Sequence, residues 1–114
     1  MARTKLPDPL SRRHLVEGEL TAQQALEIAE AYLAEGRRIE AVDFLRKANA
    51  GDRLAALRAE AIGDGDAFLL RRVAECMAVA PTREEWRALA EGAERNGKDR
   101  YAAEARRLSE RGKE

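Results

Sequence analysis

The stretch from Thr21 to Ala41 reads TAQQALEIAEAYLAEGRRIEA, and its pattern occurs a second time near the C-terminus. Each copy places apolar or small residues at three- and four-residue steps, then a glycine, then an alanine five residues later. The first copy has Ala25, Ile28, Ala29, Tyr32, Gly36 and Ala41, and the second has Trp86, Leu89, Ala90, Ala93, Gly97 and Ala102. Such steps put side chains on one face of a helix. The pattern predicts a helix, a glycine turn and a second helix in each copy.

Capping and turn residues divide the whole chain into helices. Two capping boxes, Thr21–Gln24 and Thr82–Glu85, mark helix starts, and Asp52 is expected to cap a further helix. Gly63-Asp64-Gly65 is the sharpest expected break, and Pro81 is expected to stop the helix before it. The expected ranges are about 10–17, 22–35, 38–49, 52–62, 66–79, 83–96 and 98–111. No strand-like alternation occurs, so the predicted fold class is all-α.

The spacing of the glycines leads to a family resemblance. Gly63 and Gly97 are 34 residues apart, which is the tetratricopeptide period. In this alignment a weaker middle copy uses Ala55, Ala56 and Ala59 at the offsets of Leu89, Ala90 and Ala93. The chain therefore resembles the tetratricopeptide (TPR) family over about residues 22–111. HEAT-like helix pairs remain the rival fold.

The resemblance implies a right-handed stack of about three antiparallel helix pairs, a TPR-like α-solenoid, preceded by a short N-terminal helix. The expected organisation is an arm with that helix at 1–20, a repeat domain at 21–111 and a frayed tail at 112–114. The family's proline is absent after the first pair. Arg106 and Ser109 replace apolar or small residues in the last helix, as a polar terminal repeat would.

Composition narrows the function classes. Hydrophobic residues make up 45% of the 114 residues, enough for one ordered domain with a modest core. Basic and acidic residues are equal at 21 each, which disfavours nucleic-acid binding. No secretory signal and no apolar run of membrane-spanning length occur, so the expected compartment is the cytoplasm and no membrane contact is expected.

Catalytic and metal-binding residues are sparse. His14 is the only histidine and Cys76 the only cysteine, so neither a His-based metal site nor a disulfide is expected. Asp64 and Asp66 lack the further oxygen ligands of a calcium loop. Trp86 is interpreted as a core residue. We therefore expect no enzyme activity, no metal and no cofactor.

The resemblance implies a small protein–protein interaction module, an adaptor or scaffold. In that family the first helix of each pair lines a concave groove that receives a peptide or a partner helix. Carried onto this sequence, the groove residues are Gln23, Leu26, Glu30, Leu33, Glu60, Glu84, Arg87, Glu91 and Glu94. Their acidic character suggests a basic or amphipathic partner, and self-association stays open. The alternative is a DNA-associated or regulatory helical domain that uses Arg71 and Arg72. The partner and the pathway cannot be inferred from the sequence.

Overall fold

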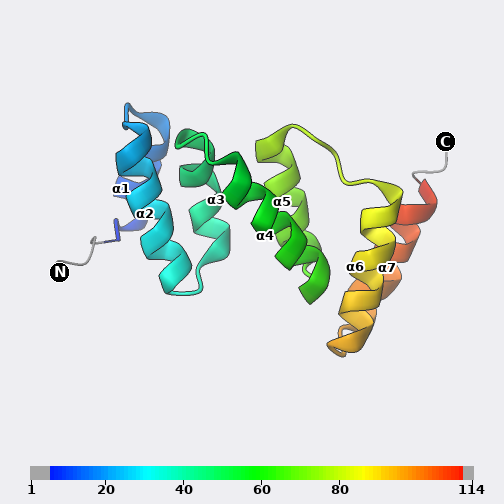
Figure 1. The fold of residues 1–114 in the computed structure, drawn as a ribbon. Coiled ribbons are helices and arrows are strands. Elements are labelled where there is room, and N and C mark those ends of the chain that lie inside the picture. The colour runs from blue at the N-terminus through cyan, green and yellow to red at the C-terminus, as the bar shows by residue number, and fades with distance from the viewer. Residues whose placement is uncertain (1–5, 112–114) are drawn as a thin grey trace. The chain divides into compact units, whose positions relative to one another are not determined.

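A computed structural model describes residues 6–111, which form seven helices and no strand (Figure 1). The helices are α1 (Pro9–Glu17), α2 (Ala22–Ala34), α3 (Arg38–Lys47), α4 (Gly51–Asp64), α5 (Ala67–Met77), α6 (Arg83–Arg95) and α7 (Asp99–Arg111). The all-α prediction is confirmed. The first residues of the predicted arm and the predicted tail at 112–114 lie outside the described residues, as does the side chain of Tyr101.

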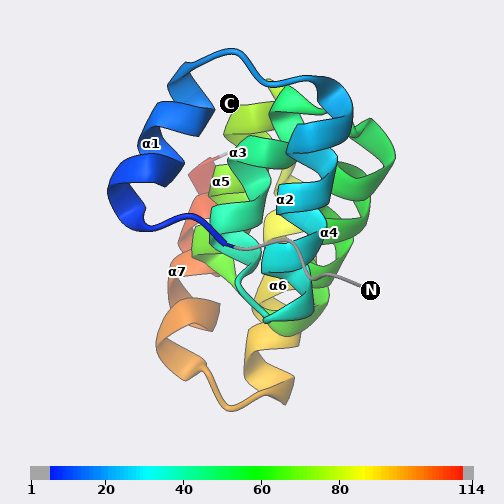
Figure 2. The ribbon, with the colours of Figure 1, turned by 90° about the vertical axis from the view of Figure 1, so that its left-hand side faces the viewer.

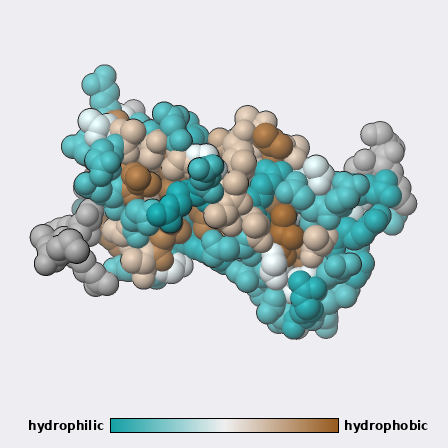
Figure 3. All heavy atoms as spheres, in the orientation of Figure 1, coloured by the Kyte–Doolittle hydropathy of each residue, from teal (hydrophilic) through white to brown (hydrophobic). Residues whose placement is uncertain are grey.

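The chain divides into two compact units, and α4 begins in one and continues in the other. The N-terminal unit comprises Met1–Leu54, and the C-terminal unit comprises Ala55–Glu114. In the N-terminal unit α2 pairs with α3, and α1 also packs against α3 (Figure 2). In the C-terminal unit α4 pairs with α5 and α6 pairs with α7. Polar side chains cover most of the visible surface of each unit (Figure 3).

The helix starts follow the capping residues of the sequence. Both capping boxes are formed, with Thr21 accepting from the amide of Gln24 and Thr82 from that of Glu85. Asp8 and Asp66 cap α1 and α5 in the same way. Asp52 does not cap α4, because that helix already begins at Gly51 and places Asp52 in its first turn.

Five helices end in the same hydrogen-bonded turn, closed by one residue with a positive φ. Within the three helix pairs this residue is a glycine: Gly36, Gly65 or Gly97, with φ of 73°, 72° and 72°. Between successive pairs it is Asn49 or Ala78, with φ of 54° and 57°. In each turn its amide bonds the carbonyl three residues earlier, and the next amide bonds the carbonyl five residues earlier. This is the Schellman motif, which satisfies carbonyls that the helix leaves without partners. Ala78 thus ends α5 before Pro81 is reached.

The turn geometry corrects the predicted repeat. Gly63 lies inside α4, and Gly65 makes the turn, so the glycine spacings are 29 and 32 residues rather than 34. Packing distinguishes the two glycines: a Cβ on Gly65 would lie 2.4 Å from the Cα of Ala93, whereas a Cβ on Gly63 would meet nothing within 4 Å. A close backbone approach admits only glycine.

Alignment on Gly36, Gly65 and Gly97 gives three equivalent first helices. The residues 11, 8, 7 and 4 positions before each glycine are all buried: Ala25, Ile28, Ala29 and Tyr32; Leu54, Leu57, Arg58 and Ala61; Trp86, Leu89, Ala90 and Ala93. The alanines that the 34-residue alignment assigned to packing are exposed: Ala55, Ala56 and Ala59. The buried positions of α4 therefore match those of α2 and α6, except that one of them holds a charged residue, Arg58.

Two aromatic rings fill the core between α2 and α3. Tyr32 and Phe44 stack with ring centroids 5.7 Å apart, and both side chains are fully buried. Arg37 lies 5.0 Å from the Tyr32 ring centroid, at cation–π distance. The Tyr32 hydroxyl is buried with no hydrogen-bond partner among the described residues, which costs stability.

Alanine substitutions distinguish the two glycines of the middle turn. Gly65→Ala should lower the free energy of unfolding by about 2–4 kcal/mol, because the left-handed φ and the contact with Ala93 both oppose a Cβ. Gly63→Ala should raise it by about 0.5 kcal/mol, because alanine is the better residue within a helix. Gly36→Ala, strained in φ but with open space around it, should fall between them. Urea denaturation measures the free energy of unfolding of all three variants. A larger loss of stability in Gly63→Ala than in Gly65→Ala would mean that Gly63, and not Gly65, makes the turn.

Removing the buried hydroxyl gives a second stability test. Tyr32→Phe should leave stability unchanged or raise it by about 1 kcal/mol, because the ring stack is kept and an unsatisfied polar group is lost. Tyr32→Leu, which also removes the ring, serves as the matched destabilising variant. A clear loss of stability in Tyr32→Phe would mean that the hydroxyl has a partner.

Candidate functional site

The residues predicted to bind a partner are divided between the two units. The N-terminal unit holds Gln23, Leu26, Glu30 and Leu33, all on α2. The C-terminal unit holds Glu60 on α4 and Glu84, Arg87, Glu91 and Glu94 on α6. Each group is therefore described within its own unit.

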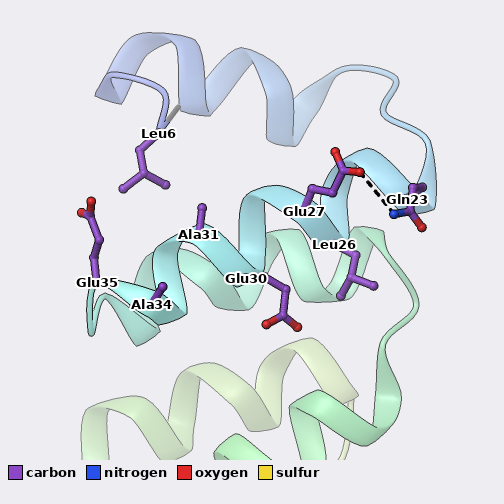
Figure 4. A pocket seen from close by; sticks show the side chains of 8 residues that line it. All are labelled: Leu6, Gln23, Leu26, Glu27, Glu30, Ala31, Ala34 and Glu35. Atoms are coloured by element: carbon purple, nitrogen blue, oxygen red, sulfur yellow. Dashed lines mark hydrogen bonds between the residues drawn. The ribbon is translucent and has the colours of Figure 1, made fainter. Parts of the chain in front are cut away.

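A cavity of about 380 Å³ lies along α2 in the N-terminal unit (Figure 4). Its lining residues, which define the α2 cavity, are Leu6, Gln23, Leu26, Glu27, Glu30, Ala31, Ala34 and Glu35. Three of the four predicted residues of this unit line it. Leu33 does not: it is half-buried beside the packed stripe of the helix.

The face of α2 that borders the cavity is the one that pairing with α3 leaves uncovered. Gln23, Glu27, Glu30 and Ala34 follow one another at three- and four-residue steps, so they form one row along the helix. Gln23 Nε2 donates to Glu27 Oε1 at 3.2 Å within this row. Figure 4 shows Leu6 approaching from the segment before α1, on the side of Ala31 and Glu35. Apolar side chains thus flank a polar row.

The charge of the α2 cavity is negative. Its described lining residues include three glutamates, Glu27, Glu30 and Glu35, and no basic residue. The guanidinium of Arg53, in the first turn of α4, reaches Glu30 from outside the lining, with Nη2 2.6 Å from Oε1. Arg53 is the only cation that the described residues bring to these glutamates. The cavity therefore favours positively charged groups.

Four of the five predicted residues of the C-terminal unit form a row on α6, and the fifth, Glu60, is exposed on α4. Glu84, Arg87, Glu91 and Glu94 are all exposed. Glu94 accepts from Arg106 Nε on α7 at 3.1 Å, and its carboxylate raises the pKa of the Arg106 guanidinium. The hollows found in this unit involve other residues. One is lined by Arg71, Ala74, Glu75, Ala78, Val79, Ala80 and Pro81, and another by Arg71, Glu104, Arg107 and Leu108.

Some exposed apolar residues were not predicted as surface features. Phe68 on α5 is 66% exposed and Val79 just after it is 53% exposed. Phe68 directly precedes two buried leucines, so hydrophobicity alone could not distinguish it from them. The helical periodicity of α5, with Leu69, Leu70 and Val73 buried, is the signal that places Phe68 on the outer side.

The arginines of the DNA-binding alternative are engaged with the chain itself. Arg71 donates to Glu104 at 2.9 Å and lies 5.6 Å from the centroid of the Trp86 ring. Arg72 pairs with Glu75 at 3.3 Å. Each of these two guanidinium groups therefore has a carboxylate of the chain beside it. Trp86 itself is buried, as predicted.

The remaining chemically reactive residues lie apart from one another. His14 is exposed on α1, and Cys76 is half-buried with its Sγ 4.0 Å from Arg72 Nη1. Asp66 caps α5, and the backbone carbonyl of Asp64 accepts from Lys98 Nζ. Among residues 6–111 no three potential metal ligands of the His, Cys, Asp and Glu types come together.

One buried ionic cluster was not predicted. Arg58, 8% exposed, donates to both carboxylate oxygens of Glu85 at 2.7 Å and to the carbonyls of Val79 and Ala80 at 2.9 and 3.2 Å. The hydrogen bond from Arg58 holds the pKa of Glu85 below its usual range, and the same bond raises the pKa of Arg58. These bonds tie α4 to the α5–α6 link. The cluster is therefore interpreted as structural.

Comparison with models of protein families, with curated proteins and with solved structures finds no match to this chain. None of the helices within the described range is long and apolar enough to cross a membrane. Function is therefore inferred from the geometry of the chain.

The Arg58–Glu85 cluster predicts a pH-dependent stability. Glu85→Gln should lower the free energy of unfolding by about 2–3 kcal/mol at neutral pH, because it leaves a buried guanidinium without its counter-charge. Glutamine keeps the capping box, as Gln24 does in α2. Because the folded pKa of Glu85 is depressed, its stabilisation is present above the unfolded pKa and lost as pH falls through the folded pKa.

The difference between wild type and Glu85→Gln should therefore shrink when urea denaturation is repeated at about pH 3, below the ordinary glutamate pKa. Glu84→Gln, at the exposed neighbouring position, is the control and should change little at either pH. An equal deficit at both pH values would contradict an ionic origin.

Proposed function

We propose that this chain is a small, non-catalytic interaction module that binds a peptide or partner helix at the α2 cavity. The observation that carries this proposal is an acidic cavity with apolar sides on a helix face that pairing does not use. Its size lies in the range of protein ligand sites. Gln23, Leu26 and Glu30, expected from sequence to contact a partner, line it.

The proposal includes the repeat identity of the three helix pairs. Their first helices share four buried positions, and their turns share one hydrogen-bond pattern. Copies of one helix–turn–helix unit, similar to tetratricopeptide repeats but with altered spacing, would account for both features. The right-handed solenoid stays a prediction.

The proposed partner is a basic amphipathic segment. Leu6 and Leu26 offer apolar contact at the two sides of the cavity, and the glutamate row between them offers charge. A helix with apolar residues on one stripe and arginine or lysine beside it presents both complements. The DNA-associated alternative gains no support from Arg71 and Arg72, which pair with the chain's own glutamates. Self-association is a further outcome that sedimentation can detect.

A titration tests this function directly. The isotope-labelled protein is titrated with a short synthetic amphipathic helix of leucine and arginine, and with the same helix carrying glutamate in place of arginine. The arginine peptide should shift the amide resonances of α2 residues, and the glutamate peptide should not. Leu26→Ser should weaken the binding about tenfold, because it removes an apolar contact worth about 1–2 kcal/mol, while the thermal melt changes little.

Leu10→Ser supplies the matched control. Leu10 is 68% exposed on α1 and does not line the cavity, so its substitution should leave the affinity unchanged. Absence of binding by either peptide, with no self-association in sedimentation, would reject the proposed function. If the Leu26→Ser variant unfolds, Leu26 is needed for the core and is not a partner-binding residue.

A further inference from the structure

The Arg53–Glu30 ion pair joins a residue of the α2 cavity lining to an arginine outside that lining. Glu30 lines the cavity, and Arg53 Nη2 lies 2.6 Å from its Oε1. That oxygen is itself shielded from solvent, although the side chain as a whole is 39% exposed. One residue of the cavity lining, Glu30, therefore already binds a guanidinium, and this guanidinium belongs to the chain.

The contact is easily exchanged, as comparison with the structural cluster shows. The side chains of Arg53 and Glu30 are 56% and 39% exposed, against 10% and 23% for Arg58 and Glu85. Exposed pairs are screened by water and contribute little, whereas a buried pair cannot be separated cheaply. Within residues 6–111, Arg53 makes no hydrogen bond to a backbone carbonyl, whereas Arg58 donates to two. Water or another cation can replace it at Glu30.

The helix that carries Arg53 does not favour its position. Arg53 lies in the first turn of α4, where the helix dipole presents positive charge. A cation there is repelled by its own helix, and the Glu30 carboxylate offsets this repulsion. The ion pair thus responds to any change in the charge near Glu30.

A second hollow in the same unit offers room for the side chain. It has a volume of about 430 Å³ and is lined by Leu26, Asn49, Ala50, Gly51, Asp52 and Arg53. Leu26 therefore lines both hollows. Arg53 itself lines this hollow, so its side chain borders open space beside the pair with Glu30.

From these contacts we propose that Arg53 is an internal competitor for the α2 cavity. A basic side chain of the partner takes its place at Glu30, so partner binding and the Arg53–Glu30 pair exclude each other. This inference rests on the proposed function and adds that the partner must supply a cation at Glu30. If Arg53 is a competitor, its removal should raise the affinity for the partner. Removal of a residue that contacts the partner would lower that affinity.

The test measures the affinity of the leucine–arginine peptide for the full chain and its Arg53→Ala variant. Removing the competitor should strengthen binding about two- to fivefold, the range expected for losing an exposed ion pair. Arg46→Ala, an exposed α3 arginine outside both hollows, removes the same charge and should have a smaller effect. Thermal melting confirms that each variant is folded.

A double-mutant cycle identifies Glu30 as the shared partner. In the Glu30→Gln background the gain from Arg53→Ala should disappear, because there is no carboxylate left to compete for. Unchanged or weaker binding by Arg53→Ala, in a protein whose wild type binds the peptide on α2, overturns the competitor role and leaves the proposed function intact. An equal gain from Arg46→Ala also overturns it. Failure of wild type and variant alike to bind rejects both proposals.

Discussion

Each helix pair depends on a single residue with a left-handed backbone conformation at the end of its first helix. Gly36, Gly65 and Gly97 adopt φ near +72° and close the same two hydrogen bonds. These bonds satisfy the last carbonyls of the first helix and reverse the chain within a few residues. The residues 11, 8, 7 and 4 positions before each of these glycines are all buried. The core of each pair is therefore set by the position of its turn.

The sequence was sufficient to predict the helices, both capping boxes and most of the buried stripe, because these follow from local periodicity and side-chain hydrogen bonds. It was insufficient to choose between Gly63 and Gly65, since either glycine can end a helix. The choice is made by Ala93, whose backbone lies against Gly65 from another helix. Aligning the wrong glycine produced the 34-residue spacing and assigned exposed alanines to the core. The error came from a contact distant in sequence.

The candidate site shows the same division between local and distant information. Helical spacing placed Gln23, Leu26 and Glu30 together on one face of α2, and they do line a cavity. The cavity also needs Leu6, from the segment before α1, and its charge is modified by Arg53 from α4. Neither residue stands at a recognisable spacing from α2. Arg58 was missed for a related reason: its equivalents Ala29 and Ala90 are small, and the equivalence appears only after the turn is placed at Gly65.

Burial assigns different roles to arginines that look alike in the sequence. Arg58 has carbonyl and carboxylate partners on several sides and little access to water, so its charge is fixed and its loss is structural. Arg53 shares one carboxylate with solvent, so another cation can replace it. A protein of zero formal net charge can thus have a cavity lined by glutamates while several of its arginines pair with carboxylates elsewhere. The balanced net charge disfavours a nucleic-acid partner, but the location and the burial of each ion pair decide which cations a partner can displace.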